Sequence, residues 1–194
     1  MSVGLQFHFC SDGAMPEARF LHVWRRTRAD RPELDWMSAA IATLSKMLIR
    51  FKHVEISLPP EILRGRDCVH AKYQDCPPGA RLCISAVSSS AGKKGGTIMQ
   101  FKMLSNDNYE HTLEMRVGEA AALDILMFAD EHTGLPFSHD WNQSFFFPLP
   151  SDGSKFFCVQ YVVMCVQAAG LLEGLNPSAA TGDALLWKIG RAHV

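Results

Sequence analysis

The sequence predicts an α+β domain in which helices pack on one mainly antiparallel sheet. Segments of alternating apolar residues lie close together in the middle of the chain, and segments with a helical apolar period precede and follow them. This order of a helix, several strands and two further helices favours an antiparallel sheet. A length of 194 residues, with 47% hydrophobic and 20% charged residues, suits a single domain with a sizeable core.

The first part of the chain contains three predicted elements. Alternation of apolar residues predicts a short strand over 3–9. Asp35 is a suitable N-cap for an amphipathic helix that runs from Trp36 to about Phe51. A strand follows over 51–58, and its strict alternation divides its side chains between an apolar face and a polar face. The apolar face carries Val54, Ile56 and Leu58, and the polar face carries His53, Glu55 and Ser57.

The middle of the chain predicts the rest of the sheet and the helix that follows it. Three further strands are expected at 82–87, 97–103 and 111–117. An amphipathic helix is expected from Glu119 to about His132, because a Gly-Leu-Pro sequence follows it and ends the pattern.

The late apolar segment contains Cys158, a candidate nucleophile. The turn residues 152–154 are typical helix caps, and Gly170 is a suitable helix stop, so Cys158 is expected in the first turn of a helix. There the free N–H groups and the helix dipole favour a thiolate, which is the nucleophilic form of cysteine. Cys165 lies on the same helical face, so packing in the core is the alternative interpretation.

Charge and cysteine usage narrow the class of protein. A net charge of −1 gives no electrostatic reason to expect nucleic acid as a partner. Six cysteines without CxxC pairs, and an N-terminus without the features of a secretory signal, indicate reduced thiols in the cytoplasm. No run reaches the roughly 18 apolar residues of a membrane span. We therefore expect a soluble cytoplasmic protein, and its oligomeric state is not indicated.

A possible metal site was considered in the loop between the second and third strands. Cys68, His70 and Cys76 lie there, but a fourth ligand at a zinc-site spacing is missing. We therefore expect neither a metal nor a cofactor. At the other end of the chain, residues 189–194 resemble the translation of a DNA-sequencing adapter, so we expect this tail to be non-native and the domain to span 1–188.

Several segments, taken in order, resemble the circularly permuted papain-like proteins of the NlpC/P60 superfamily. In that family a strand histidine comes early, as His53 does in 51–56, and the nucleophilic cysteine comes late, at a helix start. The segment 156–163 resembles the family pattern Phe-Cys-Ser-Glu/Gln-x-Val, with Val159 in place of the small polar residue. Segments 134–138 and 174–181, the latter before a short helix over 182–188, also have family counterparts. The resemblance covers about 48–188, and it leaves 1–35 as an unassigned N-terminal extension.

The resemblance implies a papain-like fold and a cysteine-dependent hydrolase or acyltransferase. Cys158 would be the nucleophile and His53 its base, and Ser85 would hold the position of a third residue that orients the imidazole. Substrates of the family contain an amide, isopeptide or ester bond, so a peptide, an isopeptide or a lipid-type substrate is expected. The alternative is a binding or scaffold protein that retains the fold with little catalysis, since Ser85 is a weaker orienter than a carboxylate.

Overall fold

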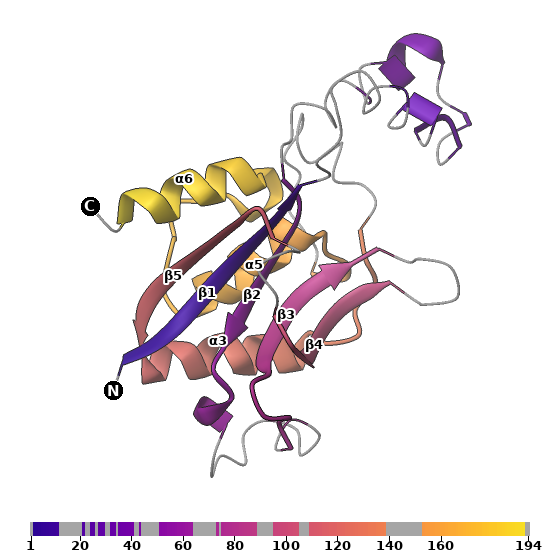
Figure 1. Cartoon of the computed structure of the whole chain (residues 1–194). Coiled ribbons are helices and arrows are strands. Elements are labelled where there is room, and N and C mark those ends of the chain that lie inside the picture. The colour runs from indigo at the N-terminus through magenta and orange to yellow at the C-terminus, as the bar shows by residue number, and fades with distance from the viewer. Residues whose placement is uncertain are drawn as a thin grey trace.

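The computed structural model describes residues 2–11, 51–63, 75–88, 95–104, 109–138 and 153–192, together with Tyr73 and short pieces between 21 and 43. These residues form an α+β fold with a five-stranded antiparallel sheet (Figure 1). The strand order across the sheet is β4-β3-β2-β1-β5. The strands are β1 (Ser2–Ser11), β2 (Phe51–Leu58), β3 (Arg81–Val87), β4 (Gly96–Lys102) and β5 (His111–Gly118).

Helices pack on one face of this sheet. Figure 1 shows α3 (Glu119–Glu131) and α5 (Cys158–Ala168) behind the strands, and these two helices also contact each other. A further helix, α6 (Gly182–Ala192), packs against β2, β5 and α5. Two short 3-10 helices, η1 (Pro60–Leu63) and η4 (Pro177–Ala179), lie in the connections. None of the helices in the described part of the chain is long and apolar enough to cross a bilayer.

Strand register explains why the core lies on the helix side. Phe7 of β1 is opposite Ile56 of β2 and Leu113 of β5, so apolar residues from neighbouring strands share one face of the sheet. The helices cover this face with their own apolar side chains, which removes both surfaces from water and stabilises the packing of the two layers. Fully buried members of this core include Leu5, Phe7, Phe9, Val54, Ile56, Leu58, Leu82, Ile84, Ile125, Leu126, Tyr161, Val162 and Val166.

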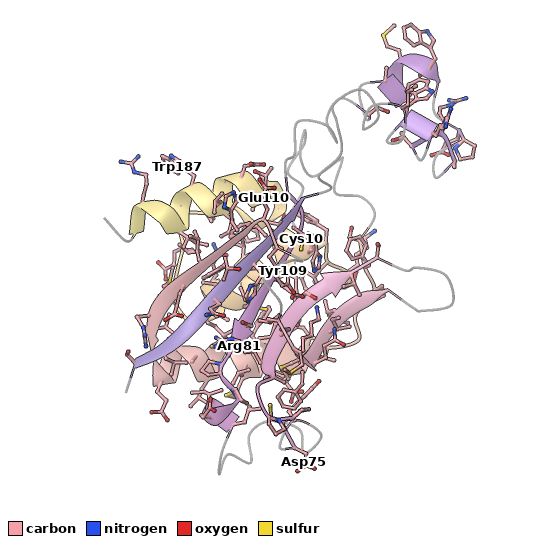
Figure 2. All side chains as sticks on the ribbon, in the orientation of Figure 1. Cys10, Asp75, Arg81, Tyr109, Glu110 and Trp187 are labelled. Atoms are coloured by element: carbon pink, nitrogen blue, oxygen red, sulfur yellow. The ribbon has the colours of Figure 1, made fainter. Side chains whose placement is uncertain are left out.

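The first strand occupies an interior position in the sheet. β1 pairs with β2 on one side and with β5 on the other, although the resemblance had placed the core at about 48–188. The predicted strand over 3–9 is confirmed, and it belongs to the core rather than to an extension. At the other end, α6 continues into the segment 189–194, and Ile189 is fully buried. Figure 2 shows Trp187 of the same helix pointing away from the sheet.

The predicted helix boundaries differ from the structure in two places. α5 begins at Cys158 with Phe157 as its N-cap, so the turn 152–154 is not the cap. The reason is that Phe156 still pairs as an isolated bridge with Phe137, and this extended backbone delays the helix. The helix predicted from Trp36 to about Phe51 is helical at 36–40 and at 43, and its positions 41–42 and 44–50 lie outside the described residues. Phe51 is already the first residue of β2.

Other boundaries agree closely with the sequence. The strands at 82–87, 97–103 and 111–117 and the helix from Glu119 are confirmed within one residue. Gly170 follows the end of α5 with a φ of 70°, a left-handed conformation that glycine adopts at low cost. The hydroxyl of Thr181 accepts a hydrogen bond from the Ala184 N–H at 3.1 Å, as expected for the cap of the last helix.

A hydrogen bond between the two helices tests this packing. The buried Tyr161 hydroxyl of α5 donates to the Ala129 carbonyl of α3 at 3.0 Å. We predict that Tyr161→Phe lowers the free energy of unfolding by about 1 kcal/mol, because the ring still fills its site while one buried hydrogen bond is lost. Urea denaturation measures this change. An unchanged midpoint and slope would show that the hydroxyl contributes nothing to the contact between α3 and α5.

Candidate active site

The structure brings His53 and Cys158 together although 105 residues separate them in the sequence. His53 lies near the start of β2, and Cys158 is the first residue of α5, which packs against β2. Their side chains share a hydrogen bond. Cys158 is 7% exposed, and the His53 side chain is 28% exposed. The predicted pair of candidate nucleophile and base is therefore a contact pair at the junction of the sheet and a helix start.

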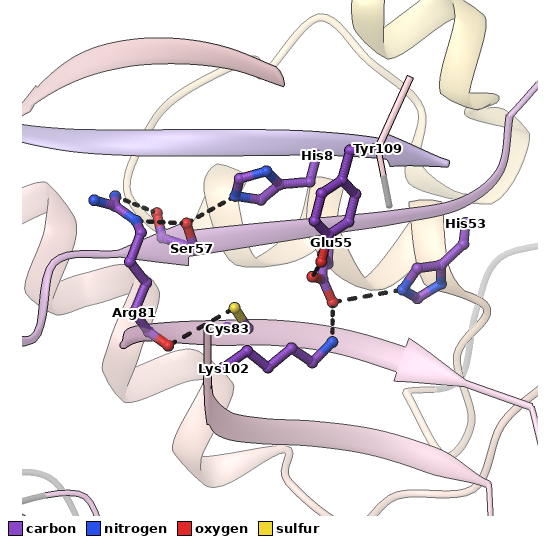
Figure 3. A network of polar contacts seen from close by, with 8 residues as sticks. All are labelled: His8, His53, Glu55, Ser57, Arg81, Cys83, Lys102 and Tyr109. Atoms are coloured by element: carbon purple, nitrogen blue, oxygen red, sulfur yellow. Dashed lines mark hydrogen bonds and ion pairs between the residues drawn. The ribbon is translucent and has the colours of Figure 1, made fainter. Parts of the chain in front are cut away.

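The His53 ring also lies beside a carboxylate. His53 Nε2 lies 3.6 Å from Glu55 Oε2, within the range of an ion pair (Figure 3). Both residues come from β2 and are two positions apart, so they project from the same face of the sheet. The sequence showed this alternation, and it was the signal by which Glu55 could have been found. His53 thus lies beside both a thiol and a carboxylate.

Glu55 makes the contact that was expected from Ser85. Ser85 lies on β3, as predicted, and its side chain is fully buried. Its Oγ has no hydrogen-bond partner within the described part of the chain. The expectation placed the third residue on the strand after the histidine, whereas the carboxylate two residues along the same strand lies closer to the ring. The structure therefore brings together Cys158, His53 and Glu55, and Ser85 makes no side-chain hydrogen bond to them within the described part of the chain.

Two further side chains hold the Glu55 carboxylate, and neither could be identified from a local sequence pattern. Glu55 is fully buried, so its charge has to be balanced inside the protein. Lys102, at the end of β4, donates to Oε2, and the hydroxyl of Tyr109, just before β5, donates to Oε1. Figure 3 shows the lysine and the tyrosine approaching the carboxylate from different elements. Three elements of the fold therefore meet at one carboxylate.

These contacts shift the pKa values of the pair in opposite directions. Burial alone would lower the pKa of His53, but the hydrogen bonds to Cys158 and Glu55 outweigh it and raise this pKa to about 9. Burial alone would raise the pKa of Glu55, but the hydrogen bonds from His53, Lys102 and Tyr109 lower it to about 2. At neutral pH the pair is therefore an imidazolium beside a carboxylate.

A second histidine lies in a neighbouring polar cluster and has the opposite character. His8 Nε2 lies 2.9 Å from Ser57 Oγ, and His8 Nδ1 lies 3.2 Å from Thr112 Oγ1. Arg81 donates to the same Ser57 hydroxyl at 2.9 Å. Burial lowers the pKa of His8 to about 4, although Glu55 acts in the opposite direction. His8 is therefore a neutral ring whose polar atoms are satisfied.

Burial raises the thiol pKa of each of the other described cysteines. Burial raises the pKa of Cys10 to about 11 and that of Cys83 to about 12. Burial also raises the pKa values of Cys76 and Cys165 above the ordinary range. The remaining cysteine of the possible zinc site, Cys68, and its neighbour His70 lie outside the described residues. Within the described residues, three or more potential metal ligands do not gather anywhere.

Comparisons with known proteins gave no result for this chain: no protein-family model, no curated protein and no solved structure matches it. Support for a function therefore comes from the site itself, from the order of its residues along the chain and from the class of the fold.

The two histidines provide a direct test of the electrostatics. We predict that His53 remains protonated up to about pH 9 and that His8 remains neutral down to about pH 4. The reason is that His53 contacts a carboxylate and a thiol, whereas His8 is buried among neutral hydroxyl groups. Titration of the ring nitrogens by NMR measures both values. A His53 ring that titrates near 6.5, the ordinary value, would show that Glu55 and Cys158 do not stabilise its charge.

The thiols are predicted to differ sharply in reactivity. Cys158 should be alkylated first when the native protein is treated briefly with iodoacetamide at about pH 6, because an adjacent imidazolium favours the reactive thiolate. Peptide mapping by mass spectrometry identifies the labelled residue. Cys76 is the matched control, since it is more exposed than Cys158 but has a raised pKa. Faster labelling of Cys76 would contradict activation of Cys158.

Proposed function

We propose that this protein is a cysteine-dependent hydrolase or acyltransferase that acts on an amide, isopeptide or ester bond. Cys158 is the nucleophile, His53 is the general base and acid, and Glu55 orients and stabilises the imidazolium. The fold proposed with this activity is the permuted papain-like fold of the NlpC/P60 superfamily. Two features support it: the histidine strand precedes the cysteine helix in the chain, and the observed class is α+β with an antiparallel sheet.

The observation that carries the proposal is the position of the His53 ring. The ring is hydrogen-bonded to a cysteine at the first position of a helix, and its Nε2 lies 3.6 Å from a buried carboxylate. A nucleophile, a base and a group that orients the base are the parts of an activated-cysteine site. A cysteine that served only in packing would not require an ionised histidine beside it.

The first chemical step is acyl transfer to sulfur. His53 holds the proton of the Cys158 thiol, and the thiolate attacks the carbonyl carbon of the substrate. The C–S bond forms as the carbonyl π bond opens, and the negative charge moves to the oxygen. N–H groups in the first turn of α5, which have no acceptor within the helix, are placed to stabilise this oxyanion.

The second half of the reaction restores the site. The tetrahedral intermediate collapses, the bond to the leaving amine or alcohol breaks, and His53 gives its proton to the leaving group. A thioester on Cys158 remains. Attack by water then releases an acid, whereas attack by another amine or alcohol transfers the acyl group. In either case His53 takes a proton from the incoming nucleophile and the thiolate leaves.

Glu55 does not take up the proton of His53 during these steps. Its pKa of about 2 is far below the value of about 9 for His53, so the carboxylate does not take up the proton itself. Its role is to hold the ring orientation and to balance the imidazolium charge, as the third member of a triad does.

Substitutions at the three positions test the proposal. We predict that Cys158→Ala abolishes turnover of acyl esters from a fluorogenic panel, and that His53→Ala costs nearly as much, because both losses disable the same step. Glu55→Gln should lower kcat by about tenfold or more, since the imidazolium loses its counter-charge. Initial rates on purified, folded variants measure these effects.

Ser85→Ala is the matched control for Glu55→Gln. Both residues are buried on neighbouring strands, but only Glu55 contacts the imidazole, so Ser85→Ala should change kcat by less than about twofold. Equal losses in the two variants would remove Glu55 from the site. If no acyl thioester can be trapped on Cys158 with any ester, and the thiol is unreactive toward the alkylating reagent, the binding-protein alternative is favoured.

A further inference from the structure

We propose that Lys102 and Tyr109 are positioning residues that fix the Glu55 carboxylate, and that the charge of Lys102 sets the pH range in which Cys158 reacts. This inference rests on the proposed function. It assigns a role to two side chains that lie outside the Cys158–His53–Glu55 set, and it makes the pH range of Cys158 reactivity depend on a charge outside that set.

The geometry of the carboxylate supports the first part. Glu55 is fully buried, and each of its oxygens has a different donor: Lys102 at Oε2 and Tyr109 at Oε1. His53 Nε2 is 3.6 Å from the same Oε2 that Lys102 contacts. A carboxylate held at both oxygens cannot rotate away from the ring. The position of the imidazole is therefore constrained through one residue of β4 and one residue that precedes β5.

The arrangement of charges in the site supports the proposed role of Lys102 in setting the pH range. The reactive form of the cluster is neutral overall. It pairs the ammonium of Lys102 with the carboxylate of Glu55, and the imidazolium of His53 with a thiolate at Cys158. Without the ammonium group the same form would carry one uncompensated negative charge in a buried place. A proton taken up by the thiolate would cancel that charge. Loss of Lys102 is therefore expected to favour the unreactive thiol.

Other titratable groups around the cluster do not replace this cation. Arg81 donates to Ser57 and to the backbone of Gly4 rather than to Glu55. Several titratable groups surround His53 and Glu55. They are Cys10 and His8 on β1, Arg81 and Cys83 on β3, Lys102 on β4, Tyr109 before β5 and Cys158 on α5.

Tyr109 is itself held in place. Its ring packs on the ring of His8 with centroids 4.7 Å apart, and His8 is fixed by its contacts with Ser57 and Thr112. Burial and the hydrogen bond to Glu55 raise the pKa of the Tyr109 hydroxyl. This hydroxyl therefore keeps its proton and donates a hydrogen bond to the carboxylate. The neutral polar cluster around His8 thus helps to hold Tyr109 in contact with Glu55.

The test follows the rate of Cys158 alkylation by iodoacetamide as a function of pH, and it requires no substrate. In Lys102→Met the pH of half-maximal reactivity should rise by about one unit relative to the unaltered protein. Lys102→Arg, which keeps the charge, should restore the original profile. The matched control is Arg116→Met, which removes a cation that is largely exposed and paired with Glu114 rather than with Glu55. This control should leave the profile unchanged.

Two further variants keep the proposal testable if Lys102→Met does not fold. The double variant Lys102→Met with Glu55→Gln removes both charges of the buried pair, so its profile should return toward that of the unaltered protein. Tyr109→Phe removes a donor but no charge. It should lower the alkylation rate by about tenfold, the factor that corresponds to one hydrogen bond to a charged group, without moving the profile along the pH axis.

The outcomes separate this inference from the proposed function. If Cys158 of the unaltered protein is not the most reactive thiol at about pH 6, the proposed function fails first. If Cys158 is the most reactive thiol but Lys102→Met and Arg116→Met give the same profile, only the role of Lys102 is overturned. A profile that shifts equally in Tyr109→Phe and Lys102→Met would show that loosening of the site, rather than charge, controls reactivity.

Discussion

A buried carboxylate is the constraint on which the rest of this structure depends. Glu55 is fully enclosed and ionised, a state that is costly unless several donors surround it. Its donors come from β4, from the segment before β5 and from its own strand, so the strands have to assemble in the observed order before the charge is balanced. Assembly of the sheet and formation of the candidate site are therefore one event.

One face of β2 contributes to the hydrophobic core, and the other face carries the polar and charged groups of the site. Val54, Ile56 and Leu58 face the helices and belong to the hydrophobic core. Glu55 and Ser57 alternate with them and are equally buried, but each is satisfied by hydrogen bonds. A strand with one polar face normally exposes that face to water. Here the polar face is enclosed. The electrostatic interaction between Glu55 and Lys102 is therefore stronger than at a surface, because solvent screens it little.

Much of the fold could be predicted from local patterns, whereas only part of the site could. Strict alternation located β2, and β3 and β5 were recognisable as further short apolar segments. The pairing of His53 with Cys158 came from the order of motifs, since periodicity contains no information about contacts between distant segments. The alternation of β2 places Glu55 on the same face as His53, but the resemblance indicated Ser85 instead. Lys102 and Tyr109 lie 47 and 54 residues from Glu55, and only the assembled sheet brings them to it.

The contact between Cys158 and His53 joins the helix layer to the sheet, and the two layers pack through apolar side chains. Eight of the eleven residues of α5 are buried, so the core determines where the helix lies and where its first residue ends up. His53 is fixed from the other side, through Glu55 and the strands. The separation of nucleophile and base therefore depends on the volume of the side chains between helix and sheet, and interiors resist changes in that volume. Substitutions in the core, such as at Val162 or Ile56, can in this way alter the reactivity of Cys158 without touching it.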